Sequence, residues 1–256
     1  MLSCHPKIKT KKCINKNIKN KLKARWNRMS TKKIRRNNDI MKELRNILKC
    51  SNDYCVLNKI DKELLDNNFA PKAPYYWNSN VRSGMNALSS LDIINVMKQY
   101  EEKYKTFKFI GPSPIDYNFD KNGRCVCNNL CNYTKDKRKV GIIFNLDPHY
   151  LKGSHWVCLY IDNSKKIIVY FDSLGNKINS NIKSFVDDNL QDYEYIDNYN
   201  YIHQNGNTSE CGMYCLHIII TLLTNRKINN NKDIKRFIRK RISDDKIHKY
   251  RYKYFN

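Results

Sequence analysis

The chain has 256 residues, 41% of them hydrophobic, which is enough for one large or two small domains and excludes a fully disordered chain. Gly (8) and Pro (6) are too scarce for a collagen-like or linker-rich protein. The best candidate for a membrane span, residues 216–223, is too short to cross a bilayer. Lys and Arg number 48 and Asp and Glu 24, so the formal net charge is +24.

The first part of the chain is basic and weakly helical in pattern. Residues 1–37 are rich in Lys and Asn with sparse apolar residues, which is typical of either a flexible arm or a weak basic helix. Apolar residues at helical spacing predict short helices over 39–48 and 55–65. Residues 69–75 contain two prolines and read as a linker. We therefore expect a basic N-terminal arm or small helical region over 1–70 and a second domain over 71–256.

The second domain shows an order of helix, several strands and helix. A helix is expected from Ser89 or Ser90 to about residue 103. Strands are expected over 105–110, 140–146, 155–161, 166–172 and 193–202, with helices over 180–189, 211–223 and 233–241. This order predicts an α+β fold with a mixed or antiparallel central sheet, ending in a basic C-terminal helix.

The positive charge lies at the two ends of the chain. Residues 1–49 carry 17 basic and 2 acidic side chains, residues 225–256 carry 12 and 3, and the middle is neutral. Basic ends bind nucleic acid, acidic proteins or anionic surfaces through counterion release. A codon bias toward Lys and Asn explains the same composition without any partner.

The ten cysteines are scattered, and no apolar secretory segment follows the basic N-terminus. We therefore expect a reducing compartment and mostly free thiols. Cys125, Cys127 and Cys131 lack a fourth ligand and the usual C-x2-C spacing, so no metal or other cofactor is expected.

A histidine and an aspartate are predicted to face each other across a hairpin. If Asn163 and Ser164 form its two-residue loop, every facing pair sums to 327, which places His155 opposite Asp172; a four-residue loop gives the same register. A carboxylate beside an imidazole fixes its tautomer, as in a catalytic triad. A structural His–Asp pair explains the same spacing.

Cys211 stands where a polar Gly- and Asn-containing loop enters an apolar helix. A helix N-terminus and a neighbouring imidazolium both favour a thiolate, and Gly212 allows another chain to approach closely. The amide of Gln204 and the N–H groups of the loop are candidate oxyanion donors. A buried cysteine in a helix cap is the alternative, and Cys215 is interpreted as core packing.

The sequence His155-Trp156, Phe171-Asp172-Ser173, Gln204 and Glu210-Cys211-Gly212 resembles the superfamily of the adenovirus protease and the ubiquitin-like-protein (SUMO) proteases over about residues 80–224. Within it, the chain is most similar to core- or capsid-maturation proteases of large cytoplasmic DNA viruses. The resemblance implies a papain-like triad in the permuted order His-Asp-Cys.

The resemblance implies a role for each matching residue. His155 is the general base, Asp172 its orienter and Cys211 the nucleophile. Gln204 is the oxyanion donor, with Asn205 as the fallback because it occupies the SUMO-protease spacing. The remaining residues implied to line or order the substrate site are Trp156, Asn145 and Gly212.

The implied function is a viral cysteine endopeptidase that cleaves structural polyproteins, after Gly-Gly or similar small residues, in the host cytoplasm and the virion. An isopeptidase that removes a SUMO- or ubiquitin-like modifier is the first alternative. A basic nucleic-acid-binding protein without activity is the second, and it predicts that Cys211 is dispensable.

Overall fold

The computed structural model describes all residues except 1, 10–11, 36–38, 75–86 and 117–136. The chain divides into two compact units. Unit 1 comprises Met1–Lys72 and Lys253–Asn256, and unit 2 comprises Ala73–Tyr252. The three cysteines considered for a metal site, Cys125, Cys127 and Cys131, lie outside the described residues.

Unit 1 contains four helices: α1 (Lys16–Met29), α2 (Ile40–Leu48), α3 (Asp53–Ile60) and α4 (Lys62–Asn68). Each begins after an Asn or Asp whose side chain accepts a backbone N–H of the first turn, which satisfies an otherwise unpaired donor. Their apolar faces share one core, which includes Leu22, Leu44 and Leu57, all fully buried. Of the two alternatives for residues 1–37, the chain adopts helix over α1.

The expectation of mostly free thiols is wrong for unit 1. Cys4 is bonded to Cys13, and Cys50 is bonded to Cys55, in two disulfides. The bonded cysteines are 9 and 5 residues apart in the chain, and the spacing of the ten cysteines does not show which of them lie close together in space. In the part of the chain that the structure describes, the free cysteines are Cys158, Cys211 and Cys215, all buried.

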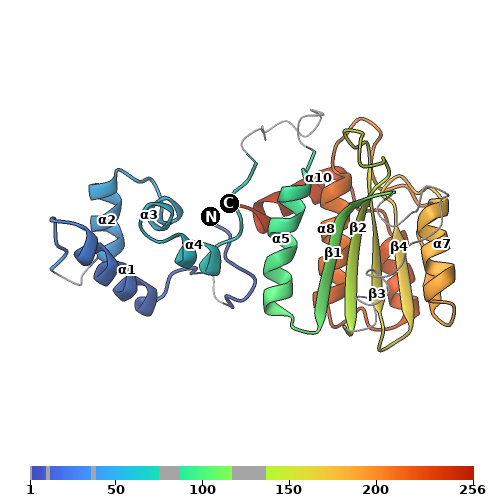
Figure 1. The fold of residues 1–256 in the computed structure, drawn as a ribbon, viewed down its shortest axis with the longest axis horizontal. Coiled ribbons are helices and arrows are strands. Elements are labelled where there is room, and N and C mark those ends of the chain that lie inside the picture. Colours follow the sequence, from blue (N-terminus) through green and yellow to red (C-terminus); the bar gives the residue numbers. More distant parts are fainter. Residues whose placement is uncertain (1, 10–11, 36–38, 75–86, 117–136) are drawn as a thin grey trace. The chain divides into compact units, whose positions relative to one another are not determined.

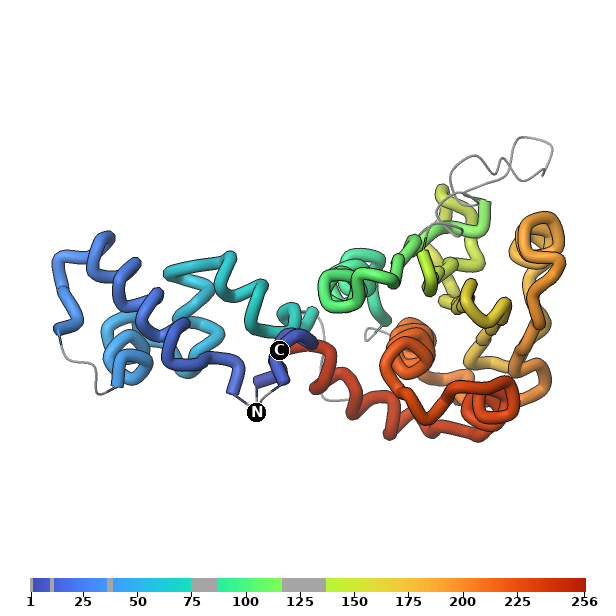
Figure 2. The backbone as a smooth tube through the Cα atoms, turned by 90° about the horizontal axis from the view of Figure 1, so that it is seen from below, coloured from blue at the N-terminus to red at the C-terminus, as the bar shows by residue number. Residues whose placement is uncertain are grey.

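The end of the chain belongs to unit 1. Asn256 accepts from the backbone N of Ser3 at 2.5 Å and donates to the carbonyls of Ser3 and Ala70 at 2.6 and 2.9 Å. Tyr254 and Phe255 are each 3% exposed. Phe69 and Ala70 are also buried in this unit, so the expected linker over 69–75 is wrong for its first residues. Figure 2 shows the red C-terminal end of the chain beside the blue N-terminal segment that contains Ser3.

Unit 2 is built on a five-stranded mixed sheet in the order β1-β2-β3-β4-β5. The strands are β1 (Phe107–Pro114), β2 (Lys139–Asn145), β3 (Trp156–Asp162), β4 (Ile167–Phe171) and β5 (Glu194–Ile196). β2, β3 and β4 are antiparallel neighbours, whereas β1 and β5 run parallel to β2 and β4. The expected α+β class with a mixed sheet is confirmed.

Helices cover both faces of this sheet. α7 (Ser180–Asn189) packs on one face, where Phe185 joins a core with Ile142 and Tyr170. α8 (Cys211–Thr224) covers the other face, where a Cβ at Gly141 would meet Ile219 at 2.8 Å. α5 (Ser90–Lys103) contacts β1, and α9 (Asn231–Arg239) contacts β5. α10 (Asp244–Tyr254) follows and was not predicted from the sequence (Figure 1).

The β3–β4 hairpin has a different register from the predicted one. Asp162 pairs with Ile167, so facing residues sum to 329 and the loop is 163–166. The Asp162 carboxylate accepts from the backbone N and hydroxyl of Ser164, and Lys166 adopts φ 51°, which together close a four-residue loop. A shift of two residues keeps every side chain on its face, so His155 and Asp172 become diagonal instead of directly opposite.

The strand expected over 193–202 is wrong after Ile196. The side chain of Asn198 turns inward and donates to the carbonyls of Asp172 and Tyr201, while its oxygen accepts from the backbone N of Asp172. These bonds replace a sheet ladder, and Asn200 has φ 65°, which no extended strand adopts. The chain therefore leaves the sheet and runs beside the loop that follows β4.

Candidate active site

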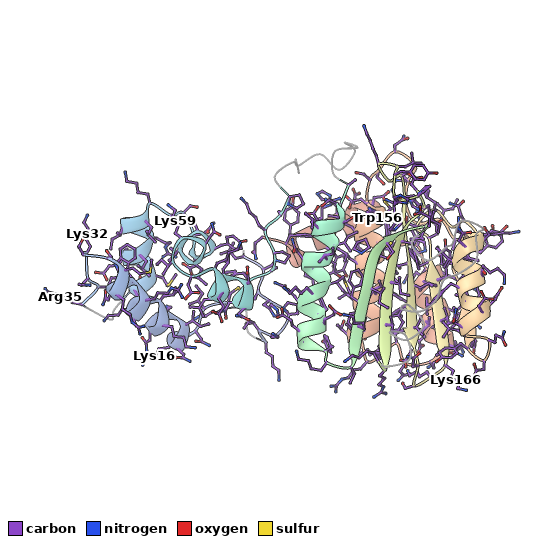
Figure 3. The ribbon with its side chains drawn as sticks, in the orientation of Figure 1. Lys16, Lys32, Arg35, Lys59, Trp156 and Lys166 are labelled. Carbon is purple, nitrogen blue, oxygen red and sulfur yellow. A yellow bond between two sulfur atoms is a disulfide. The ribbon has the colours of Figure 1, made fainter. Side chains whose placement is uncertain are left out.

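Three elements bring His155, Asp172 and Cys211 together at one end of the sheet. His155 precedes β3, Asp172 follows β4, and Cys211 is the first residue of α8. Figure 3 labels Trp156 at this end of the sheet and Lys166 at the opposite end, in the hairpin loop. The site is therefore built from the residues that flank the strands, which the rigid sheet holds in place.

Asp172 is fully buried, and its carboxylate is held by three donors. Nε2 of His155 lies 2.6 Å from Oδ1, which also accepts the backbone N of Leu174 at 2.8 Å. Oδ2 accepts the side-chain amide of Asn176 at 3.0 Å. Buried carboxylates need such partners to remain ionised. Asp172 thus presents a fixed negative charge to the imidazole.

The environment of His155 has opposing effects on its pKa. Burial lowers its pKa, but the hydrogen bonds with Asp172 and with Cys211, and the charges of both, raise it further, to about 9. The imidazolium is therefore populated at neutral pH. A protonated imidazole between a carboxylate and a thiol favours the thiolate–imidazolium pair that cysteine nucleophiles use.

Cys211 is 7% exposed and begins an apolar helix. Its position places the sulfur at the positive end of the α8 dipole. Cys215, one turn later, is buried and lies beside Cys158 of β3; burial raises its pKa well above the ordinary value. Cys215 accordingly remains a protonated thiol of the core, as the sequence predicts.

The loop before α8 holds Gln204 firmly and turns Asn205 outward. Gln204 is 5% exposed; its Oε1 accepts the hydroxyl of Ser173 at 2.7 Å and its Nε2 donates to the carbonyl of Thr208 at 2.7 Å. One hydrogen of that amide is left for another acceptor. Asn205 is exposed, and its Oδ1 accepts from Arg241 at 3.1 Å. This geometry favours Gln204 as the oxyanion donor.

Trp156 and Gly212 meet beside the nucleophile. The indole N–H of Trp156 donates to the carbonyl of Leu88 at 3.1 Å. A Cβ at Gly212 would lie 3.1 Å from Leu88 Cβ and 3.2 Å from Trp156 Cδ1, tighter than ordinary contact. Gly212 thus permits close approach of Leu88, a residue that sequence reasoning did not single out.

Asn145 orders the loop that leads into His155. It pairs with Trp156 across β2 and β3 and accepts from the backbone N of Asp147 at 3.0 Å. Gly153, at φ 88°, packs directly on it, since a Cβ there would lie 2.1 Å from Nδ2 of Asn145. Its role is to shape the 146–155 turn.

Two groups of residues with a structural role at the site were missed from sequence. Asn198 bonds both backbone polar groups of Asp172, and Glu210, next to Cys211, forms a buried ion pair with Arg251. The only sequence signal for Asn198 was a polar residue inside an apolar strand pattern. The sequence drew attention to Glu210 only as part of the Glu210-Cys211-Gly212 motif.

Other kinds of site find no support among the described residues. There, no group of three or more His, Cys, Asp or Glu is arranged to hold a metal ion. Within the same ranges, every helix is too short or too polar to cross a bilayer.

A His-Asp-Cys constellation is an arrangement that cysteine peptidases use. The model of the Ulp1 protease family, C-terminal catalytic domain, matches residues 90–253, so the chain belongs to this family. This confirms the resemblance and the assignment as a thiol-dependent hydrolase.

One relative comes from a virus. The chain is 33% identical over 153 residues to the putative thiol protease R355 of Acanthamoeba polyphaga mimivirus, covering 56% of this chain and 50% of the relative. It thus spans about half the length of the curated relative it matches. The crystal structure of the ASFV pS273R protease matches with a TM-score of 0.69 and 20% identity, over 99% of this chain and 95% of that one. The similarity to the ASFV pS273R protease is a similarity of fold.

Proposed function

We propose that the protein is a viral cysteine endopeptidase that processes structural polyproteins through Cys211, His155 and Asp172. The observation that carries the proposal is the 2.6 Å contact between His155 and the buried Asp172, with the same imidazole hydrogen-bonded to Cys211 at the start of α8. The relative from a virus supports the viral part of this proposal. On this proposal the enzyme acts at assembly sites in the host cytoplasm and in the virion.

The proposed reaction follows papain-like chemistry. The Cys211 thiolate attacks the scissile carbonyl carbon, and the C=O electron pair moves to oxygen. The Gln204 amide and backbone N–H groups at the start of α8 stabilise that oxyanion. His155 gives its proton to the leaving amine as the C–N bond breaks, then removes a proton from the water that hydrolyses the thioester. Asp172 holds the imidazole in place throughout.

We propose small residues, such as Gly-Gly, before the scissile bond. The support is the close packing of Trp156, Leu88 and Gly212 beside Cys211, where a single added Cβ at residue 212 has no room. Side chains that approach the sulfur past this wall meet the same restriction.

Replacement of Cys211 by Ala tests the proposal. Wild type is expected to release new N-termini after small residues from viral structural polyproteins, read by N-terminal proteomics, and Cys211→Ala to release none. Cys215→Ala is the matched control, because it removes a buried thiol from the same helix and leaves the site intact. Equal cleavage by Cys211→Ala would refute the function.

The alternative substrate is a conjugated ubiquitin-like modifier, because the resemblance to SUMO proteases implies the same fold and triad for both activities, so that only the substrate separates them. A SUMO-like vinyl sulfone probe separates the two. Efficient labelling of Cys211, with no cleavage of polyprotein peptides, would favour the isopeptidase.

We further propose that the basic ends contact nucleic acid or acidic proteins without sequence preference. In support, Lys16, Lys32, Arg35 and Lys59 are exposed and lie at the outside of unit 1 (Figure 3). Replacing all four by Glu should weaken DNA binding and flatten its salt dependence; an unaltered slope would refute the contact.

A further inference from the structure

Glu210, the residue before Cys211, is fully buried and carries a side chain that does not cap its helix. It occupies the N-cap position of α8, with φ −90° and ψ 2°, yet its carboxylate accepts no backbone N–H of the first turn. An acidic N-cap ordinarily accepts such a bond. The carboxylate is instead turned toward α10.

Two side chains of α10 hold this carboxylate. Arg251, 2% exposed, donates through Nε to Oε1 and Oε2 at 3.1 and 3.0 Å and through Nη2 to Oε2 at 2.8 Å. His248 places Nδ1 3.0 Å from Oε1. The Arg251 contact is two-pronged, which fixes direction as well as distance. Glu210 is therefore immobilised by α10.

The same helix anchors the other end of the loop before Cys211. Asp244, at the start of α10 and 4% exposed, accepts the backbone N of Asn205 at 3.0 Å and the hydroxyl of Thr208 at 3.1 Å. The segment 205–210, which joins the proposed oxyanion donor to the proposed nucleophile, is thus held on α10 at both ends.

The charges around Cys211 explain why Glu210 needs a cation. From the sheet side, His155 is hydrogen-bonded to Cys211. From α10, Arg251 and His248 contact the Glu210 carboxylate, and Tyr214 of α8 lies near it and bonds to Asp244. An unpaired carboxylate one residue from the sulfur would oppose formation of the thiolate. The guanidinium of Arg251 neutralises the charge of the Glu210 carboxylate by direct contact.

We propose that Arg251 is a positioning residue for Cys211: through its buried ion pair with Glu210 it fixes the backbone at the start of α8 and removes the negative charge that would otherwise disfavour the thiolate. The inference rests on the proposed function, since it assigns Cys211 as the nucleophile. It makes α10 a structural part of the active site although α10 contributes no group that touches substrate.

Alkylation of the full-length protein with iodoacetamide, quantified on the Cys211 peptide by mass spectrometry across pH, tests this directly. In Arg251→Met the rate is expected to rise with pH about one unit later than in wild type, because the carboxylate is unpaired. Arg251→Lys should keep most of the wild-type profile. Glu210→Gln combined with Arg251→Met removes both charges and should return the profile to its original pH.

The outcomes separate the alternatives. A folded Arg251→Met with the wild-type profile overturns the proposal, and so does a double variant that stays shifted. If His248→Gln shifts the profile as far as Arg251→Met, the charge compensation belongs to His248 and the assignment to Arg251 is wrong. Alkylation needs no substrate, so a profile that behaves as expected in a protein that cleaves no peptide would refute the proposed function alone.

Discussion

Asp172→Asn removes the charge next to His155 while keeping the size of the side chain. In the unsubstituted protein the hydrogen bonds and charges of Asp172 and Cys211 overcome burial and raise the pKa of His155 from 6.5 to about 9. That rise in the pKa corresponds to about 3.5 kcal/mol. With Asp172 neutral, burial is opposed by Cys211 alone, so we expect the pKa of His155 to fall by at least about one unit.

The loss of imidazolium has two measurable consequences. The alkaline limb of kcat/KM, near pH 9 in wild type, should move to lower pH, and kcat/KM at pH 8 should fall about 10- to 100-fold. Stability changes in the same range. Because the folded pKa of His155 is raised, its stabilising contribution is complete below pH 6.5 and lost as pH rises through about 9. Asp172→Asn should flatten that decline.

A fluorogenic Gly-Gly-type peptide supplies the kinetics, and urea unfolding between pH 6 and 9.5 supplies the stability. Asp116→Asn is a matched control: Asp116 contacts His149 at 2.5 Å in a second His–Asp pair of unit 2, but His149 is largely exposed. That control should retain both wild-type profiles. An alkaline limb that stays near pH 9 in Asp172→Asn would show that Asp172 does not support the imidazolium.

Three further substitutions test the close packing at Gly212, the hydrogen bonds of Asn198 and one disulfide of unit 1. Gly212→Ala forces a Cβ to about 3.2 Å from Trp156 and should lower kcat/KM about tenfold with a smaller loss of stability; wild-type kinetics would contradict the close-packed wall. Asn198→Ala leaves the backbone N–H of Asp172 without its partner, while the carbonyl of Asp172 still accepts the backbone N of Gly175, so urea unfolding should show a loss of about 1–3 kcal/mol, and no loss would mean that water replaces the amide. Cys50→Ser opens one disulfide and should destabilise unit 1 by about 2 kcal/mol, checked by thermal unfolding without reductant.

Local patterns were enough to predict most of unit 2. The helix over 180–189 and the strands around 140–146, 155–161 and 166–172 follow apolar runs of the right length, and the structure confirms them within about a residue. The approach of His155 to Asp172 was also correct, although the register was wrong by two residues. The error did no harm to the prediction of the pair because side-chain direction alternates with a period of two.

Long-range partners explain what was missed. Arg251 finds Glu210 across 41 positions, and Asn198 meets Asp172 only because the chain leaves the sheet. No local spacing encodes either contact. The core of unit 1 was missed for another reason: α1 is Lys-rich and has few apolar residues, and only its packing against α2, α3 and α4 shows that those few belong to one interior.

The pairing of Asn256 with Ser3 and Ala70 has a consequence for synthesis on the ribosome. Most of unit 1 precedes the sheet in the chain, but Tyr254, Phe255 and Asn256, which complete it, follow the sheet. Its helices are therefore translated before the sheet, and their packing is completed only after residues 254–256 have been made. Its final closure is a late event that follows translation of the whole sheet.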